Sequence, residues 1–342
     1  MCQALNFAPN KTKRLMITRK WEEKDINEAM FPVEEQDICL AGQFGRGPKI
    51  AGYHAIVDTE RGRTLSVVTN NYKLILNREA YELADLIIRG VFTDRTIHDF
   101  VCYNVRVSRS RGSCIIDLII PNNFEQLFGD PNESWTPFLR ITNSYNRRSV
   151  LRYDVGFCRW ICLNGCIFGQ KGFTISIRHD DLDTYEDYQK VIREARDKMG
   201  NIESIWKTII RRLESLRQIE ISQMMVLPLF CKIFGVRIDK DKMTDAKRES
   251  LATRARQILN SAQEYFDEMG SNAYALFNVM TDYASFPADF SENSVTVHNL
   301  QHRVGRWVDE FIEAHAKDGF SLSKYIGEDA MDAAFFMETL VK

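Results

Sequence analysis

The spacing of apolar residues changes near Asp180, and this change restricts the fold more than any other feature of the sequence. Before Asp180, apolar and polar residues alternate in short runs such as residues 49–58, a pattern typical of half-buried strands. After it, apolar residues recur three and four positions apart, as on one face of a helix. The sequence therefore predicts an α+β protein, with an antiparallel sheet and packed helices in the N-terminal half and a helical C-terminal half.

Three regions follow from this pattern. Residues 1–44 are polar and mixed in composition, and we expect them to form an N-terminal arm. Residues 45–181 are expected to form the antiparallel α+β core, with hairpins around a helix over residues 77–90. Residues 182–342 are expected to form helices that pack on this core, because no low-complexity linker separates the two halves.

The composition indicates both size and compartment. The chain has 342 residues, 44% of them hydrophobic, which suffices for a large core. No apolar run approaches the about 18 residues of a membrane span, and the first residues lack the apolar segment of a secretory signal. We therefore expect reduced cysteines, a cytoplasmic location and no membrane partner.

Charge is distributed unevenly along the chain, although the net charge is only −2. Residues 104–178 contain ten Lys and Arg against five Asp and Glu, a local charge of +5. Residues 281–342 contain five against eleven, a local charge of −6. Clusters of like charge are typical of binding surfaces. The basic region is therefore the candidate for contact with an anionic partner.

The stretch Phe138–Gly165 carries the strongest functional signal. It contains five arginines and one acid, Asp154, and aromatic residues such as Tyr145 and Trp160 stand between them. Single-stranded nucleic acid needs cations for its phosphates and flat rings for its unstacked bases. The stretch therefore predicts a site for single-stranded DNA or RNA.

The same stretch is expected to change its structure midway. Residues 138–145 alternate like a strand, and residues 149–165 are expected to form a helix. Such a helix would align Arg148, Arg152 and Arg159 along one stripe that lines a groove. The alternative is that these arginines form internal ion pairs, and the sequence leaves that alternative open.

A basic hairpin tip is expected upstream of this stretch. Two predicted strands flank the turn RSRG at residues 109–112, and Arg106 lies on the incoming strand. Such a tip would reach a backbone phosphate, and a solvated turn is the alternative. Lys171 lies in a further predicted turn. The candidate nucleic-acid-binding residues are Arg106, Arg109, Arg111, Arg140, Asn143, Tyr145, Arg147, Arg148, Arg152, Arg159 and Lys171.

Two groups of residues have spacings that suggest a metal site. Cys158, Cys162 and Cys166 stand four apart, but a zinc site of this kind needs a second cysteine pair, and a buried apolar face explains them better. His298 and His302 also stand four apart, but without an HExxH frame they fit an ordinary amphipathic helix. The sequence therefore predicts no metal ligand, no cofactor and no catalytic residue.

An acidic group precedes the first long helix. Asp180, Asp181 and Asp183 follow His179, and two or three such carboxylates can hold magnesium for phosphodiester cleavage. Acids in the first turn of a helix are also favoured by the helix dipole alone, and the sequence favours this second interpretation. A metal-dependent nuclease therefore remains an alternative, and no enzymatic activity is predicted.

Three blocks of the sequence resemble one known family. They are TNSY (142–145) followed by Arg159, Cys162, Asn164 and Gly165, then TNNYKLILNREAY (69–81), and NAYALFNVMTDYA (272–284). Together they resemble the phage/plasmid-like proteins known as domain-of-unknown-function family nine-three-two. Asn146 departs from the pattern, because an acid commonly stands there.

The resemblance implies an accessory protein of phages or plasmids. The leading hypothesis is a phage or mobile-element protein, in the host cytoplasm, that binds single-stranded DNA or RNA as a homo-oligomer. An annealing or recombination role would accord with the resemblance. The second hypothesis is an interaction protein that blocks a host defence or nuclease, with its acidic C-terminal half imitating DNA. The third is the metal-dependent nuclease.

Overall fold

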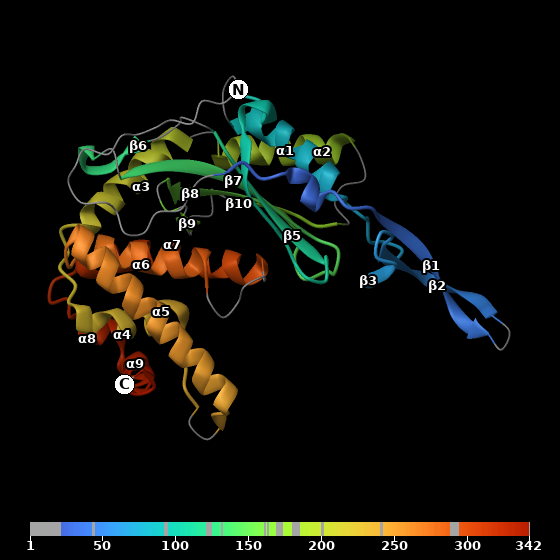
Figure 1. Cartoon of the computed structure of the whole chain (residues 1–342). Coiled ribbons are helices and arrows are strands. Elements are labelled where there is room, and N and C mark those ends of the chain that lie inside the picture. Colours follow the sequence, from blue (N-terminus) through green and yellow to red (C-terminus); the bar gives the residue numbers. More distant parts are fainter. Residues whose placement is uncertain are drawn as a thin grey trace.

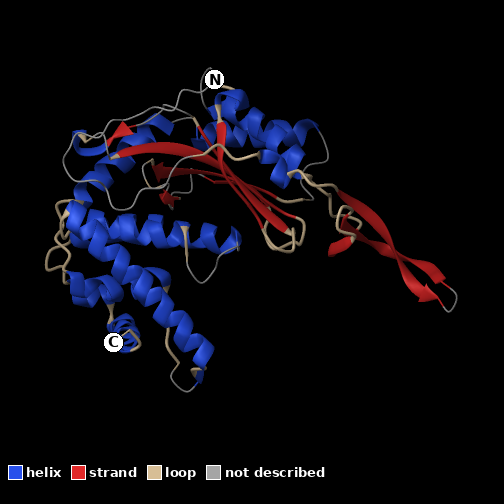
Figure 2. Ribbon diagram, viewed as in Figure 1, coloured by secondary structure: helices blue, strands red, loops and turns tan. Residues whose placement is uncertain are grey.

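A seven-stranded antiparallel sheet lies between helices, and a narrow three-stranded sheet projects from one end of the molecule (Figure 1, Figure 2). The computed structural model describes residues 22–42, 45–91, 95–120, 125–130, 133–160, 162, 164–168, 174–179, 185–199, 202–239, 242–287 and 294–341. The strands lie in the N-terminal half, together with α1, and helices form most of the C-terminal half, so the predicted α+β class is confirmed.

The large sheet has the strand order β10-β8-β7-β5-β4, and β6 and β9 pair with β7 and β8. Its paired strands run antiparallel throughout, because short turns join most neighbours. The strands are β4 (Val101–Val107), β5 (Ser113–Ile119), β6 (Glu125–Gln126), β7 (Ser134–Ser144), β8 (Leu151–Arg159), β9 (Asn164–Cys166) and β10 (Thr174–Ile177).

The small sheet contains β1 (Val33–Gly42), β2 (Gly45–Asp58) and β3 (Arg63–Thr69). Near the body, Ile56 and Val68 pack on Tyr145 in a small apolar cluster. β3 pairs with β2 only from Tyr53 to Asp58, so the outer part of β1 and β2 is a two-stranded ribbon that projects away from the body (Figure 1). β1 thus lies within the region expected to be an N-terminal arm, residues 1–44.

Helices cover both faces of the large sheet (Figure 1). α1 contacts β7, α2 contacts β10, and α7 contacts β5. Every residue of α6 is buried. The helices are α1 (Asn77–Val91), α2 (Tyr185–Met199), α3 (Ile202–Leu216), α4 (Val226–Phe234), α5 (Asp245–Met269), α6 (Ala273–Ser285), α7 (Ser294–His315), α8 (Leu322–Ile326) and α9 (Glu328–Thr339). No helix within the described residues has the length and apolar character needed to cross a membrane.

The helix predicted over residues 149–165 is wrong, because this segment forms β8, a turn and β9. Tyr153 in β8 donates a hydrogen bond from its hydroxyl to the Ala80 carbonyl of α1, whereas the next residue, Asp154, faces His298 of α7. Both faces of β8 are therefore covered. A strand buried on both faces loses the alternation of apolar and polar residues, so its sequence pattern does not distinguish it from a buried helix.

At Gly305, α7 lies close to the backbone of the segment that follows β9. A Cβ atom on Gly305 would lie 2.7 Å from the Phe168 Cα and closer still to the Ile167 carbonyl oxygen. Both are backbone atoms, so the neighbouring chain would have to shift. In α1, by contrast, a Cβ on Gly90 would have its nearest neighbour 3.6 Å away, in the Ile192 side chain.

We therefore expect Gly305→Ala to lower the free energy of unfolding by about 1–3 kcal/mol, the usual result of overpacking. Gly90→Ala is the matched control and should be neutral or stabilise by up to about 1 kcal/mol, since alanine favours helices over glycine. Chemical denaturation of both variants beside the parent measures this. Equal stabilities of the two variants would contradict the close packing of α7.

Candidate functional site

Arg140, one of the predicted nucleic-acid contacts, is an internal residue. It lies in β7, 1% exposed, and its guanidinium binds both carboxylate oxygens of Asp117 in β5 at 2.6 and 2.7 Å. A third nitrogen donates to the Gln301 Oε1 of α7 at 2.6 Å. Arg140 thus forms an internal ion pair, which is the alternative that the sequence left open. Its guanidinium is therefore unavailable to a phosphate.

Arg159 at the end of β8 has a similar environment. It is fully buried and pairs with Glu133, and its Nη2 lies 3.2 Å from the Glu268 Oε1 of α5. Arg148, Arg152 and Arg159 therefore do not form the predicted stripe, because Arg152 and Arg159 point to opposite faces of a strand. Arg148 lies exposed in the turn before β8.

Tyr145 and Asn143, the remaining buried candidates, hold the fold together. The Tyr145 hydroxyl accepts a hydrogen bond from the Asn77 backbone N–H at 2.8 Å, where α1 begins. The Asn143 amide donates to the Ile75 carbonyl and to the Asn77 Oδ1. Both side chains are 1% exposed, so Tyr145 cannot stack on a base in this structure. The TNSY block thus ties β7 to α1.

A row of polar side chains crosses the large sheet beneath α7. Neighbouring strands place its members in register, one on each strand. The Asn104 amide donates to Asp117 at 2.7 Å, and the Thr174 hydroxyl donates to Asp154 at 2.6 Å. We call this set the polar row: Asn104, Asp117, Arg140, Asp154 and Thr174.

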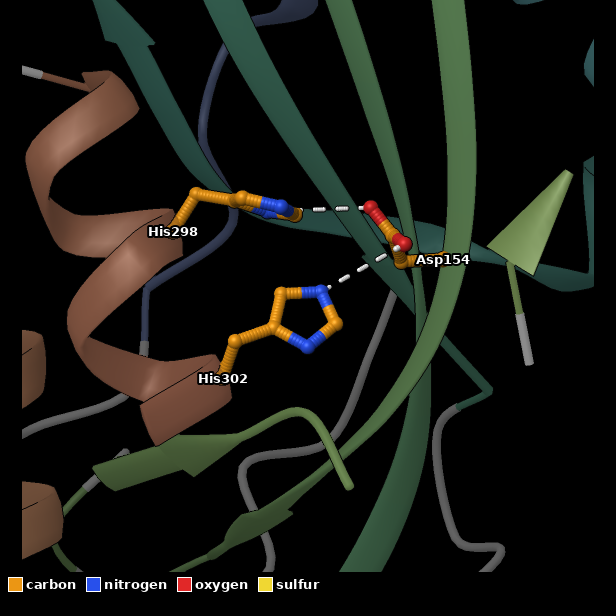
Figure 3. A group of neighbouring side chains, drawn as sticks. All are labelled: Asp154, His298 and His302. Carbon is orange, nitrogen blue, oxygen red and sulfur yellow. Dashed lines mark ion pairs between the residues drawn. The ribbon is translucent and has the colours of Figure 1, made fainter. Parts of the chain in front are cut away.

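Two histidines of α7 meet the polar row at Asp154 (Figure 3). The His298 Nδ1 lies 3.6 Å from the Asp154 Oδ2, and the His302 Nε2 lies 3.8 Å from the Oδ1. These separations are near the about 3.4 Å between ligands held at about 2.1 Å around tetrahedral zinc. Within the described residues, these three form the group of possible metal ligands, although the sequence predicted no metal ligand there.

The protonation of His298 follows from its other neighbour, Arg152. The Arg152 Nη1 lies 2.6 Å from the His298 Nε2, and a guanidinium can only donate, so Nε2 accepts and the proton stands on Nδ1. Burial lowers the pKa of His298 to about 3, and the positive charges of Arg140 and Arg152 act in the same direction against Asp154. His298 is thus a neutral side chain, and an ion at this position would have to displace its Nδ1 proton.

The spacing of His298 and His302 was visible in the sequence, but their partner was not. Asp154 comes from a strand far away in the chain, and only the packing of α7 on the sheet brings it to the histidines. Burial raises the pKa of Asp154, but the nearby His302 and His298 and the hydrogen bond from Thr174 lower it further, so that the pKa is below its usual value. Asp154 therefore remains a carboxylate.

The three cysteines with four-residue spacing lie in β8, in the following turn and in β9. Cys158, Cys162 and Cys166 are buried, and burial raises the pKa of each thiol. Buried neutral thiols are poor nucleophiles and poor metal ligands. Lys171 and the acidic group Asp180–Asp183 lie outside the described residues.

The remaining predicted arginines lie in turns or at strand ends. Arg109 and Arg147 are exposed, as is Arg148, whereas Arg106, Arg111 and Arg152 are partly buried. Arg106 donates to the Ser285 carbonyl at 2.7 Å. The structure therefore divides the predicted set into an internal group and a surface group.

We expect Arg140→Ala to lower the free energy of unfolding by about 3–5 kcal/mol, since it leaves the buried Asp117 carboxylate without its partner. Arg148→Ala, an exposed control from the same stretch, should change it by less than about 0.5 kcal/mol. Thermal melts of both variants check this. Similar melts would show that the Arg140–Asp117 pair does not hold the sheet.

Comparison with known proteins agrees with the resemblance seen in the sequence. Searches of curated proteins and of solved structures each returned no significant match. The profile of one family, described as Domain of unknown function (DUF932), matches residues 64–303, from β3 to α7. This range covers more than half of the chain and includes the polar row and both histidines of α7. The chain therefore belongs to the DUF932 family.

Proposed function

We propose that the protein binds single-stranded nucleic acid along three turns at one end of the large sheet. Arg61 lies in the turn between β2 and β3, and Arg109 in the turn between β4 and β5. Arg147 and Arg148 lie in the turn between β7 and β8. All four are exposed. We call these four residues the three-turn surface, and their clustering is the observation that carries the proposal.

Hydrogen bonds between the turns keep these arginines together. The Arg61 Nη1 donates to the Arg109 carbonyl at 3.4 Å, which joins the first turn to the second. The backbone N–H groups of Tyr145 and Asn146 donate to the Gly112 carbonyl at 2.9 and 3.2 Å, which joins the second turn to the third. The cations are therefore presented as one surface, as a phosphate backbone requires.

A cavity of about 650 Å³ opens beside the first two turns. Four arginines line it, Arg61, Arg106, Arg109 and Arg111, and Glu28 is the one acid among the lining residues. A concave surface with an excess of positive charge attracts an anionic partner. A nucleic-acid strand passing over the turns would place a phosphate in this cavity.

Two arginines in these turns have an unusual backbone conformation. Arg111 has φ 55° and Arg147 has φ 60°, values that glycine or asparagine adopt at lower cost. Such residues cost about 1–3 kcal/mol and are concentrated at functional sites. Arg111 holds Asp58 and Glu60 at the base of the ribbon, whereas Arg147 is exposed. The strain at Arg147 is consistent with selection for its side chain.

An exposed ring lies on the small sheet, five residues before the end of β2. Tyr53 of β2 is 48% exposed, and β2 leads into the turn that carries Arg61. Unstacked bases gain about 1–3 kcal/mol each by stacking on such rings, whereas a duplex keeps its bases covered. Tyr53 thus favours a single strand over a duplex as the partner, and it takes the role that the sequence predicted for the buried Tyr145.

We expect the double variant Arg109→Ala, Arg148→Ala to bind a labelled single-stranded oligonucleotide at least tenfold more weakly. Its salt slope should fall by about 0.7 for each lost phosphate contact. Tyr53→Ala should weaken binding with little change of slope, because stacking releases few counterions. Isotherms at several salt concentrations measure both.

Arg256→Ala is the control for the loss of positive charge, since Arg256 is an exposed arginine on α5 that pairs with Glu249. It should bind like the parent. Equal binding by the double variant and the control would remove the three-turn surface from the site, and no binding by the parent would refute the function.

We further propose that the ribbon joins copies of the chain into a homo-oligomer. An isolated two-stranded ribbon is marginally stable in water, and open strand edges pair readily with another chain. The outer part of the ribbon exposes Leu40 by 55%, and its strands have no further partner among the described strands. A second copy that adds strands or covers Leu40 would stabilise it.

Replacing residues 39–49 by an Asn-Gly turn should convert the oligomer to a monomer while the body stays folded. The shortened hairpin keeps the β1–β2 pairs nearest the body, from Val33↔Asp58 to Asp37↔His54. Light scattering after gel filtration measures the mass, and Met224→Ser, at another exposed apolar position, is the control. A parent that is a monomer, or a shortened variant of unchanged mass, would refute the assembly.

A further inference from the structure

A second cavity, of about 580 Å³, lies on the side of the large sheet that α7 covers. It is lined by α7, α4, α8 and the beginning of β8, and it shares no lining residue with the cavity beside the three-turn surface. Its volume is within the range of about 300–1,000 Å³ typical of small-molecule sites. His298 and His302 form part of its wall.

The cavity is lined by four cationic side chains and one acid. Arg303 and Arg306 come from α7, Lys232 from α4 and Arg152 from β8, and Glu310 is the acid. Counting the buried Asp154 beneath the histidines still leaves an excess of two positive charges. Lys232, Arg303 and Arg306 are exposed. The field in the cavity therefore favours an anion.

Several buried polar atoms around the cavity have no hydrogen-bond partner among the described residues. They are the Trp307 Nε1, the Arg152 Nε and the Tyr325 hydroxyl. Trp307 is 3% exposed. The indole and guanidinium groups can only donate. Buried polar groups are almost always satisfied, so unpaired donors beside a cavity indicate a ligand that accepts hydrogen bonds.

We propose that this cavity binds a phosphorylated small molecule of about the size of a nucleotide. The cavity offers more hydrogen-bond donors than the two oxygens of one carboxylate can accept. These donors are the unpaired groups of Trp307 and Arg152 and the cations Lys232 and Arg306. A phosphate ester brings up to two negative charges and three strong acceptor oxygens. Arginine in particular suits phosphate, because its fork makes two parallel hydrogen bonds.

A metal ion is the competing occupant of the same wall, because Asp154, His298 and His302 are spaced like ligands. Two observations disfavour it. Arg152 donates to the His298 Nε2 and thereby keeps the proton on Nδ1, the atom that faces Asp154. The surrounding cations also repel a further positive charge. These cations instead attract an anion.

Isothermal titration of the full chain with AMP, inorganic phosphate, acetate and zinc chloride tests the proposal. We expect one AMP per chain, with weaker binding of phosphate and none of acetate. Arg306→Ala should weaken AMP binding at least tenfold, the usual effect of removing a charged hydrogen-bond partner. Trp307→Phe removes the Nε1 donor but keeps a buried ring, and should weaken binding severalfold.

Arg256→Ala is the matched control, because it removes an exposed arginine of α5 that lines neither cavity, and it should leave AMP binding unchanged. Circular dichroism and a thermal melt establish that each variant is folded. Absence of AMP binding, or equal affinity of Arg306→Ala and the parent, would overturn the proposal. Acetate binding as tight as phosphate would refute the phosphate class. Zinc binding that is lost in His302→Ala, without AMP binding, would assign the wall to a metal instead.

Discussion

The buried ion pair between Arg140 and Asp117 determines how the sheet and the helical half fit together. The two residues face each other across β7 and β5, so a slip of either strand by one position would bury each charge alone. Arg140 also donates to Gln301, which fixes α7 over the same row of the sheet. Removing one partner of a buried ion pair destabilises a protein strongly, whereas replacing both partners by apolar residues is often neutral. The Arg140–Asp117 pair therefore acts mainly by excluding arrangements that would leave one of its charges buried alone.

A second buried network performs the same task near the N-terminal end of β7. The Trp135 indole donates to the Tyr274 hydroxyl, and that hydroxyl donates to Glu133, which also pairs with Arg159. Tyr274 belongs to the wholly buried α6. Charged and polar groups in the middle of β7 and near its N-terminal end thus direct α7 and α6 onto the sheet. Arg159 and Tyr274, which belong to the blocks that resemble the family, therefore have a structural role.

The location of positive charge follows from this architecture. Helices cover both faces of the large sheet, so Arg140 and Arg159 on its central strands point into the protein and pair with acids. Exposed arginines lie where the sheet ends in turns, at Arg109, Arg147 and Arg148, and along α7, at Arg303 and Arg306. The two proposed sites use these two surfaces, and their cavities share no lining residue.

The sequence by itself determined the fold class, the hairpins, α1 and most C-terminal helices, because each follows from a local apolar period. It did not determine β8, since a strand buried on both faces has no alternation to reveal it. It predicted an arginine-rich site, but which arginines are internal depends on partners such as Asp117 and Glu133 on other strands. The sequence showed that His298 and His302 stand four residues apart. They come close to Asp154 only when α7 packs on β8. Local spacing records the period of an element, whereas contacts between distant elements arise only when the chain folds.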